Sequence, residues 1–251
     1  MQALSVLSML FTTLVSLGVG VRLLFVAVRT RRQPELLFGL AFLCGGAGQA
    51  FGQIGQRVLW TEAGPLATSM NAVCLALVAA GTIALWTVTR RVFRPEGRLP
   101  GVLFALGCVA TLVGFAVRGL DGEFAHVTAG SRGHAIHEAA RLVMLSWMAF
   151  ESTRHYGMLR RRMRLGLADP MASNQLLLWT VSGYATWLAA AVISWWSFGL
   201  RIHPLESPVA TAILTVLMLV IGVGMWCAFF PPAALRRRIG ARLGGSAAAS
   251  A

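Results

Sequence analysis

The side chains with the clearest capacity for chemistry lie in one stretch, GHAIHEAARLVMLSWMAFESTRHYGMLRRR, at residues 133–162. His134 and His137 are three residues apart, and Glu138 follows directly. Two imidazoles and a carboxylate on one helical face are suitable ligands for zinc or iron. The order HxxHE differs from the HExxH of zinc peptidases, and no further acid stands where a general base is needed. Three interpretations stay open: a metal site, the mouth of a polar ligand-binding site, and interfacial residues with no ligand role.

Read at 100° per residue, the same stretch gathers most of its polar side chains on one helical face. The face consists of His134, His137, Glu138, Arg141, Leu145, Met148, Ser152 and His155. Glu138 with Arg141, and Glu151 with Arg154, are i, i+3 pairs whose charges can neutralise one another. Charges within a membrane span are costly and normally face the protein interior. We therefore expect this face to turn towards neighbouring helices, with Glu138 and Arg141 as candidate ligand-binding residues.

The placement of histidine and cysteine argues against a path of two haem groups across the membrane. A haem with two axial ligands needs them at matched depth on different helices. His155 stands alone near one end of the predicted spans, whereas the other histidines gather near the opposite end. The four cysteines lie in separate apolar stretches without CxxC spacing. We expect no cofactor, and the alternative is a metal or a single haem at His134 and His137.

A second polar motif, CGGAGQAFGQIGQR at residues 44–57, combines small residues with amides. Small residues let two helices approach closely, and amides hydrogen-bond across such a contact. The predicted helix-packing residues are Gly45, Gly48, Gly52 and Gly55. The predicted ligand-binding residues beside them are Gln49, Gln53 and Gln56, which would line a polar cavity open to the outside. Packing alone is the alternative for the whole motif.

Further candidate ligand-binding residues come from two other apolar stretches. Tyr184 and Trp187 share one stripe with small residues in the stretch that begins SNQ at residue 173. Such a stripe either packs against a neighbouring helix or forms the aromatic wall of a pocket. Asn71 lies in the outer half of an earlier span and is a candidate polar partner for that pocket.

These residues belong to a chain with the composition of a membrane protein. Hydrophobic residues make up 57% of the 251 residues and charged residues 12%, against roughly 25% charged in a soluble domain. Seven apolar runs approach the roughly 20 residues that cross a bilayer. They cover residues 3–28, 36–59, 66–88, 100–117, 135–156, 176–198 and 209–230. The predicted fold class is all-α, a polytopic membrane protein built as a seven-transmembrane-helix bundle.

Arginine placement predicts the orientation of these spans. The chain has 22 basic residues, all of them arginine, and 9 acidic residues. Sixteen of the arginines lie on one side, within residues 29–32, 90–98, 154–164 and 236–242. By the positive-inside rule this side is cytoplasmic, so we expect the N-terminus outside and the C-terminus cytoplasmic, in a bacterial inner membrane. Because the charge follows the topology, we expect no nucleic-acid partner.

The chain divides into a membrane domain and a short tail. The predicted seven-helix domain covers residues 1–232. In residues 233–243, Leu235, Ile239 and Leu243 alternate with arginine, which is typical of an interfacial amphipathic helix on the anionic lipids of the inner leaflet. A solvated basic tail is the alternative. Residues 244–251, GGSAAASA, are predicted to be flexible.

The predicted topology is similar to that of two known families. LWTVTR at residues 85–90 and SGYATWL at residues 182–188 loosely resemble retinal-pocket stretches of microbial rhodopsins. The chain contains no lysine, so retinal cannot form its Schiff base, and a retinal pigment is excluded. The resemblance to sugar transporters of the PQ-loop type is one of topology only, since residues 33–34 read QP.

Several functions stay open at this point. The leading hypothesis is a non-enzymatic, receptor-like module that senses or binds a small ligand in an outward-facing polar cavity, while its basic cytoplasmic face engages a separate protein. The alternative is a small-solute transporter, in which Arg141 attracts an anionic group and the His/Glu residues exchange protons. A metal- or haem-binding enzyme subunit and a purely structural protein are further alternatives. A cavity that reaches past mid-membrane would favour transport, and one sealed below Arg141 would favour sensing.

Overall fold

The structure, a computed structural model, describes residues 2–48, 52, 64–94, 96–125, 130–202 and 204–233. These residues form helices joined by turns, with no β-strand among them, which confirms the all-α prediction. The α-helices are α1 (Gln2–Thr30), α2 (Gln33–Leu40), α4 (Pro65–Val88), α5 (Arg98–Leu120), α6 (Arg132–Arg164), α7 (Pro170–Ser194) and α8 (Pro208–Phe229). Three π-helical segments, η1 (Ala41–Ala47), η2 (Thr89–Phe93) and η3 (Trp195–Gly199), extend α2, α4 and α7, and η4 (Pro204–Glu206) is one 3₁₀ turn.

Five of the described helical segments are long and apolar enough to cross a membrane. They are Ala3–Thr30, Ala67–Phe93, Arg98–Leu120, Pro170–Gly199 and Pro208–Phe229. The length and composition of these helices therefore identify the chain as a helical, multi-pass membrane protein. The helix α6 has the necessary length, 33 residues, but its charged face makes it less apolar than the others. The second predicted span is described only through Gly48 and at Gly52.

The surface of the bundle carries many large apolar side chains, as a lipid-facing surface does. Leu7, Leu14, Phe25, Leu106 and Phe150 are each more than 60% exposed. A soluble monomer rarely exposes contiguous apolar patches of more than a few hundred Å². Burial of the polar residues on α6 together with exposure of leucine and phenylalanine is the arrangement expected when the surrounding solvent is lipid.

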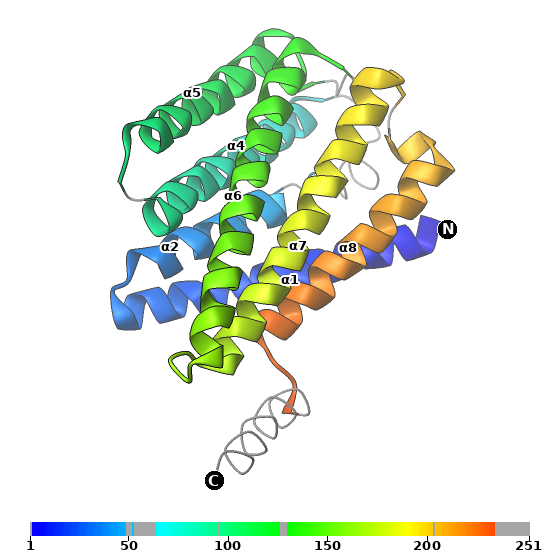
Figure 1. Cartoon of the computed structure of the whole chain (residues 1–251). Helices are drawn as coiled ribbons and strands as arrows, with labels where there is room; N and C mark the ends of the chain where they lie inside the picture. The colour runs from blue at the N-terminus through cyan, green and yellow to red at the C-terminus, as the bar shows by residue number, and fades with distance from the viewer. Residues whose placement is uncertain are drawn as a thin grey trace.

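The helices form a closed ring in chain order (Figure 1). The helix α1 packs on α2, α2 with η1 on α4, α4 on α5, α5 on α6, α6 on α7, and α7 on α8. Contacts between α8, drawn in orange, and α1, drawn in blue, close the ring. We call the end that carries Arg29, Arg91, Arg94 and Arg160 the Arg-rich end, and the end that carries His134 and His137 the histidine end.

Proline and short polar side chains set where the helices begin. Pro65, Pro170 and Pro208 stand in the first turn of α4, α7 and α8, where a missing N–H costs nothing. The Ser131 hydroxyl accepts a hydrogen bond from the His134 amide at 3.1 Å, which fixes the first turn of α6. With this cap, α6 begins at Arg132, so that His137, Glu138 and Arg141 lie in its second and third turns.

The glycine face of the second predicted span lies directly against α4. A Cβ atom at Gly81 would come within 2.2 Å of the Gly45 nitrogen, so the two backbones touch at this point. A Cβ at Gly48 would come 2.9 Å from the Leu77 Cβ, and one at Gly52 would come 3.2 Å from the Cys74 Cβ. Three of the four predicted packing glycines therefore contact α4, whereas Gly55 lies outside the described residues. The predicted interfacial helix and tail also lie outside them, apart from Ala233.

Candidate functional site

The polar face predicted on the 133–162 stretch is buried against neighbouring helices. His137, Glu138 and Arg141 are each less than 9% exposed, although two of them carry formal charges. Leu145, Met148 and Ser152, further along the same face, are also buried. The face therefore turns inward as predicted, because α5 and α7 pack on either side of α6.

Glu138 and Arg141 form the predicted i, i+3 pair. The Arg141 Nε and Nη2 atoms donate to one carboxylate oxygen of Glu138, at 3.0 and 2.6 Å. The His134 Nε2 lies 3.7 Å from the other carboxylate oxygen, and its ring packs edge-on against Phe198 with centroids 5.1 Å apart. The carboxylate thus balances the charge of the guanidinium within a single helix.

A second buried pair, between Arg118 and Glu123, was not predicted. The Arg118 Nε donates to a Glu123 carboxylate oxygen at 2.8 Å, and Glu123 is fully buried. The Asn71 amide donates to the backbone oxygen of Glu123 at 3.0 Å. Gly133 makes room for this pair, since a Cβ there would lie 2.5 Å from the Arg118 nitrogen. The loop position of Glu123 gave no periodic signal that could have revealed the pair.

The metal prediction at His134, His137 and Glu138 finds no support in the described residues. No three histidine, cysteine, aspartate or glutamate side chains among them are arranged so that they could hold a metal ion. His137 instead lies against α5, where a Cβ at Gly114 would come 3.0 Å from the His137 Cβ. His126 and His203, which could supply further ligands, lie outside the described residues.

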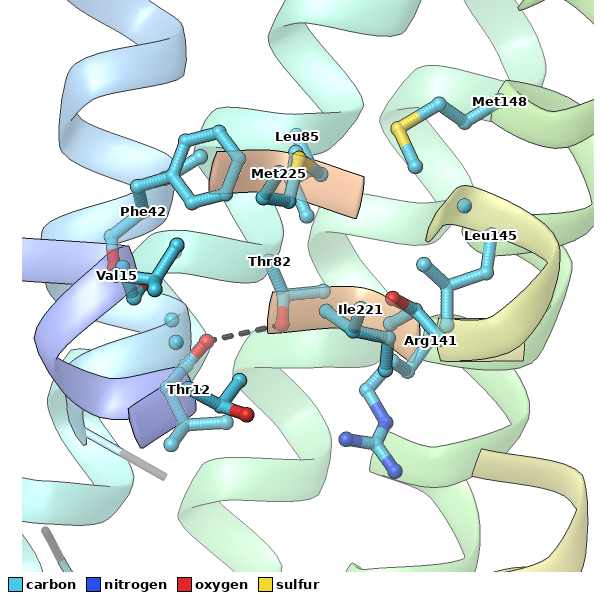
Figure 2. Close-up of a pocket in the computed structure, with 18 of the residues that line it drawn as sticks. Thr12, Val15, Phe42, Thr82, Leu85, Arg141, Leu145, Met148, Ile221 and Met225 are labelled. Atoms are coloured by element: carbon cyan, nitrogen blue, oxygen red, sulfur yellow. Dashed lines mark hydrogen bonds between the residues drawn. The ribbon is translucent and has the colours of Figure 1, made fainter. Parts of the chain in front are cut away.

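A cavity of about 190 Å³ lies in the middle of the bundle (Figure 2). The described residues of its walls come from α1, η1, α4, α6, α7 and α8. The π-helical η1 contributes Ala41, Phe42, Gly45 and Gly46. A π-helical segment widens a helix locally and is frequent at functional sites.

Most of the cavity wall is apolar and adaptable. Five methionines line it: Met9, Met144, Met148, Met218 and Met225. Phe42 and Trp179 add aromatic surface, and their rings meet edge-on with centroids 5.7 Å apart. Methionine is unbranched and polarizable, so a methionine-rich wall can adjust to ligands of different shape.

Among the described lining residues, those with a hydroxyl or a charge are Thr12, Ser16, Thr82, Thr186 and Arg141. Each hydroxyl donates to a backbone oxygen. Thr12 bonds Ser8 and Met218, at 2.8 and 3.0 Å, and Ser16 bonds Phe42 at 2.7 Å. The other two bond the carbonyl one turn earlier in their own helices. A hydroxyl has a single proton, so these four can offer a ligand only oxygen lone pairs.

The structure brings few of the predicted ligand-binding residues to this cavity. Arg141 lines it, and Glu138 stands behind Arg141 as its partner. Asn71 does not line it and bonds the loop after α5 instead. Gln49, Gln53 and Gln56 lie outside the described residues, so the predicted polar mouth is not described. The cavity that is described is mainly apolar, which the sequence reasoning did not expect.

Tyr184 and Trp187, for which packing and an aromatic wall were the two predicted roles, do not line the described cavity. Both rings lie on the outer side of α7 and are partly exposed. Their polar atoms turn towards α6: the Tyr184 hydroxyl lies 3.1 Å from the Thr153 hydroxyl, and the Trp187 Nε1 donates to Ser146 at 2.8 Å. An aromatic ring with its polar atom satisfied by a neighbouring helix suits a lipid-facing position. The aromatic wall of the cavity comes from Phe42 and Trp179.

The Arg-rich end of α6 carries a further ion cluster. The Arg94 Nε lies 2.6 Å from a carboxylate oxygen of the buried Glu151, and the Arg154 Nη1 lies 3.7 Å from the other oxygen. The Phe93 and His155 rings pack edge-on at 4.9 Å. The predicted Glu151–Arg154 pair is therefore present, but the shorter contact is made by Arg94, which follows η2 at the end of α4.

No known protein family, no curated protein and no solved structure matches this chain. The geometry alone therefore has to indicate what the site can do. A mainly apolar cavity, with Arg141 as the one charged residue among its described lining residues, suits the binding of a mainly apolar molecule.

Proposed function

We propose that the chain is a non-enzymatic seven-helix membrane protein that binds a small, mainly apolar molecule in the mid-bundle cavity. In this proposal α2 with η1 and α6 cross the membrane together with the five apolar helices. The arginine distribution supports an Arg-rich end in the cytoplasm and an N-terminus outside. A bacterial inner membrane is the setting that this distribution favours.

The cavity is the observation that carries the proposal. An apolar cavity of about 150 Å³ in a protein interior can hold benzene, so the 190 Å³ here leaves room for a somewhat larger apolar group. Protein interiors are close-packed, and a void of this size leaves its lining without contacts. A ligand that fills it restores those contacts, which gives binding a clear source of free energy.

The position of α6 supports a sensing role. Arg141, Met144, Leu145 and Met148 line the cavity, and Glu151 lies less than one further turn along the same helix. Glu151 binds Arg94 at the end of α4, so a shift of α6 on ligand binding would reach the Arg-rich end directly. A cytoplasmic protein partner at that end would then respond to occupancy of the cavity.

Transport is the second candidate, because the cavity extends from Arg141 to Trp179 and Met225, towards the Arg-rich ends of α7 and α8. Small apolar molecules, however, partition into and across a bilayer unaided. A small apolar ligand, which the apolar wall of the cavity suits, would therefore need no transporter to cross the membrane. Uptake of benzoate into proteoliposomes, compared with empty liposomes, would distinguish transport of an anion from simple binding.

Ligand binding can be tested by filling the cavity. Gly183 lines the cavity, and a Cβ there meets only the Met148 methyl at 3.9 Å, so Gly183→Leu should fit and occupy the space. We expect saturating ethylbenzene or acetophenone to raise the unfolding temperature of the purified protein by about 5 °C. Gly183→Leu should abolish this shift.

Gly157→Leu is the matched control, since Gly157 lies on α6 away from the cavity with no atom within 4 Å of an added Cβ. This variant should keep the full shift. If neither probe stabilises the wild-type protein, or if Gly183→Leu responds like Gly157→Leu, the proposed cavity is not a ligand site.

A further inference from the structure

One arginine lies on the outer surface of the bundle, where α1 packs on α8 and closes the ring (Figure 1). This residue, Arg22, is exposed and stands eight residues before the end of α1 at Thr30. The 29 residues of α1 span about 43 Å, close to the thickness of a bilayer with its headgroups. Arg22 lies about 12 Å from the end of the helix, so its backbone is inside the apolar core. A side chain as long as arginine reaches the headgroups from this depth.

Neither of the two helices supplies an acid to neutralise Arg22. The sequences of α1 and α8 contain no aspartate or glutamate, and the ion pairs of the described residues do not include Arg22. Its Nη1 donates to the backbone oxygen of Phe229, at the end of α8. The end of a helix carries only about half a negative charge. Because an unbalanced charge in a membrane is costly, Arg22 calls for a further anionic partner.

Aromatic side chains hold the guanidinium of Arg22 in one orientation. It lies over the Phe230 ring, 4.9 Å from the centroid. Phe230 in turn stacks on Trp226, with centroids 4.7 Å apart and an interplanar angle of 25°. The Nε and Nη2 atoms donate to none of the described residues. These two atoms share one edge of the planar guanidinium, and such an edge can donate two parallel hydrogen bonds to a phosphate.

The surroundings of this edge favour a lipid as the source of the phosphate. Trp226 is 45% exposed, and Phe25, one turn beyond Arg22 on α1, is 69% exposed. A free phosphate ion would gain nothing from these apolar side chains, whereas the acyl chains of a phospholipid pack against them. Arg29 and Arg31 follow on the same segment, so a zwitterionic headgroup would bring its own cation close to further positive charge. An anionic phospholipid avoids this repulsion.

We propose that Arg22, Trp226 and Phe230, here called the Arg22 site, bind an anionic phospholipid. The lipid phosphate accepts hydrogen bonds from the Nε and Nη2 atoms of Arg22, and the acyl chains lie along Trp226 and Phe25. The bound lipid supplies the negative charge that α1 and α8 lack, and thereby stabilises their contact. Arg22 does not line the mid-bundle cavity, so this inference is independent of the proposed ligand binding.

Native mass spectrometry of the full chain tests the proposal, because it resolves each bound lipid. The two probes are dioleoyl lipids that both contain a phosphate: phosphatidylglycerol, which is anionic, and phosphatidylcholine, which is zwitterionic. Each would be titrated onto the delipidated protein in detergent at an ionic strength of about 0.15 M. We expect the first phosphatidylglycerol to bind about tenfold more tightly than the first phosphatidylcholine.

Charge-removing variants on α1 locate the site. Arg22→Gln keeps a donor for the Phe229 oxygen but removes the charge and the two-donor edge. We expect its affinity for phosphatidylglycerol to fall about tenfold. Arg29→Gln is the matched control, since it removes another exposed charge about 10 Å further along the same helix, beyond the Debye length of about 8 Å. This variant should lose less than about threefold.

Arg22→Lys separates the attraction of charge from the geometry of the guanidinium. The ammonium keeps the charge and a donor for the Phe229 oxygen, but it has no planar edge with two donors. We expect a loss of about threefold in the affinity for phosphatidylglycerol. Full affinity in Arg22→Lys would contradict the two-donor contact. This variant keeps the test decisive even if Arg22→Gln does not fold.

Four other results would overturn the proposal. The wild-type chain could bind the two lipids equally, or Arg29→Gln could lose as much affinity as Arg22→Gln. Displacement of the lipid by excess inorganic phosphate would identify a site for a free anion. A dimer that Arg22→Gln disperses would place a second copy, rather than a lipid, at the Arg22 site. Since none of these results involves the cavity, the proposed function is tested separately.

Discussion

The two ends of α6 stabilise buried carboxylates in different ways. At the histidine end, the side chains of Glu138 and Arg141 are 8% and 10% exposed, and the partners belong to the same helix. At the Arg-rich end, the Glu151 side chain is 3% exposed, but the Arg94 and Arg154 side chains are 41% and 46% exposed. At one end both members of the ion pair are buried inside the protein, and at the other the arginines are partly exposed to the surroundings.

This difference indicates what each end can do. The Glu138–Arg141 pair keeps a charged guanidinium at the wall of a mainly apolar cavity. A carboxylate held by exposed arginines can exchange those partners for water, lipid headgroups or another protein. In the proposed function, the cavity beside the histidine end would hold the ligand, and the Arg-rich end would respond to its surroundings.

Removal of Arg141 should produce the largest effect. Arg141→Leu leaves the Glu138 carboxylate buried without its guanidinium, and breaking such a pair typically costs about 3–5 kcal/mol. We expect the free energy of unfolding, measured in mixed micelles, to fall by this amount. Glu138→Leu combined with Arg141→Leu should recover most of the loss, since neither charge of this pair then remains buried. If the double variant is as unstable as Arg141→Leu, the loss does not come from the unpaired carboxylate of Glu138.

At the other end, replacement of Arg94 should have a smaller effect. Arg94→Leu removes the 2.6 Å contact to Glu151, but Arg154 and water remain available to the carboxylate. We expect a loss of about 1–2 kcal/mol in the same unfolding measurement. Arg154→Leu, which removes only the 3.7 Å contact, serves as the control and should cost less than about 0.5 kcal/mol. Equal losses at Arg94 and Arg141 would remove the distinction between the two ends.

Salt should reveal the smallest difference. Exposed charges are screened at high ionic strength, whereas buried pairs are screened much less. Double-variant cycles for Glu138 with Arg141 and for Glu151 with Arg94 would give a coupling energy at each end. Between 0.05 and 0.5 M salt, we expect the coupling at the Arg-rich end to weaken by a few tenths of a kcal/mol. The coupling at the histidine end should stay constant, and an equal decline at both ends would contradict the comparison.

Periodic patterns in the sequence were enough to predict the polar face of α6. The i, i+3 spacing predicted the Glu138–Arg141 pair, and the structure has it at 2.6 Å. The predicted membrane span covers residues 135–156, and the helix α6 extends beyond it at both ends. The helix continues to Arg164 since arginine is a good helix former, and Gly166, with φ of +69°, lies just beyond the end of the helix.

The cavity and the Arg118–Glu123 pair could not be predicted in the same way. The cavity is made by apolar residues from six helical regions, and an apolar residue looks the same in a sequence whether it fills a core or borders a void. Trp179 and Phe42 therefore gave no signal, whereas Tyr184 and Trp187 attracted attention through their polar atoms. Glu123 lies in a turn, so its contact with Arg118 follows from the path of the chain rather than from a helical period.

The most direct test of the account is methyl NMR of the methionines during a titration with acetophenone. The chain has 10 methionines, five of which line the cavity, so the protein carries its own reporters and controls. The account predicts shifts for Met9, Met144, Met148, Met218 and Met225, and their loss in Gly183→Leu. Met158 and Met163, near the Arg-rich end of α6, should move little in comparison. Shifts confined to these two residues, or no shifts at all, would contradict ligand binding in the middle of the bundle.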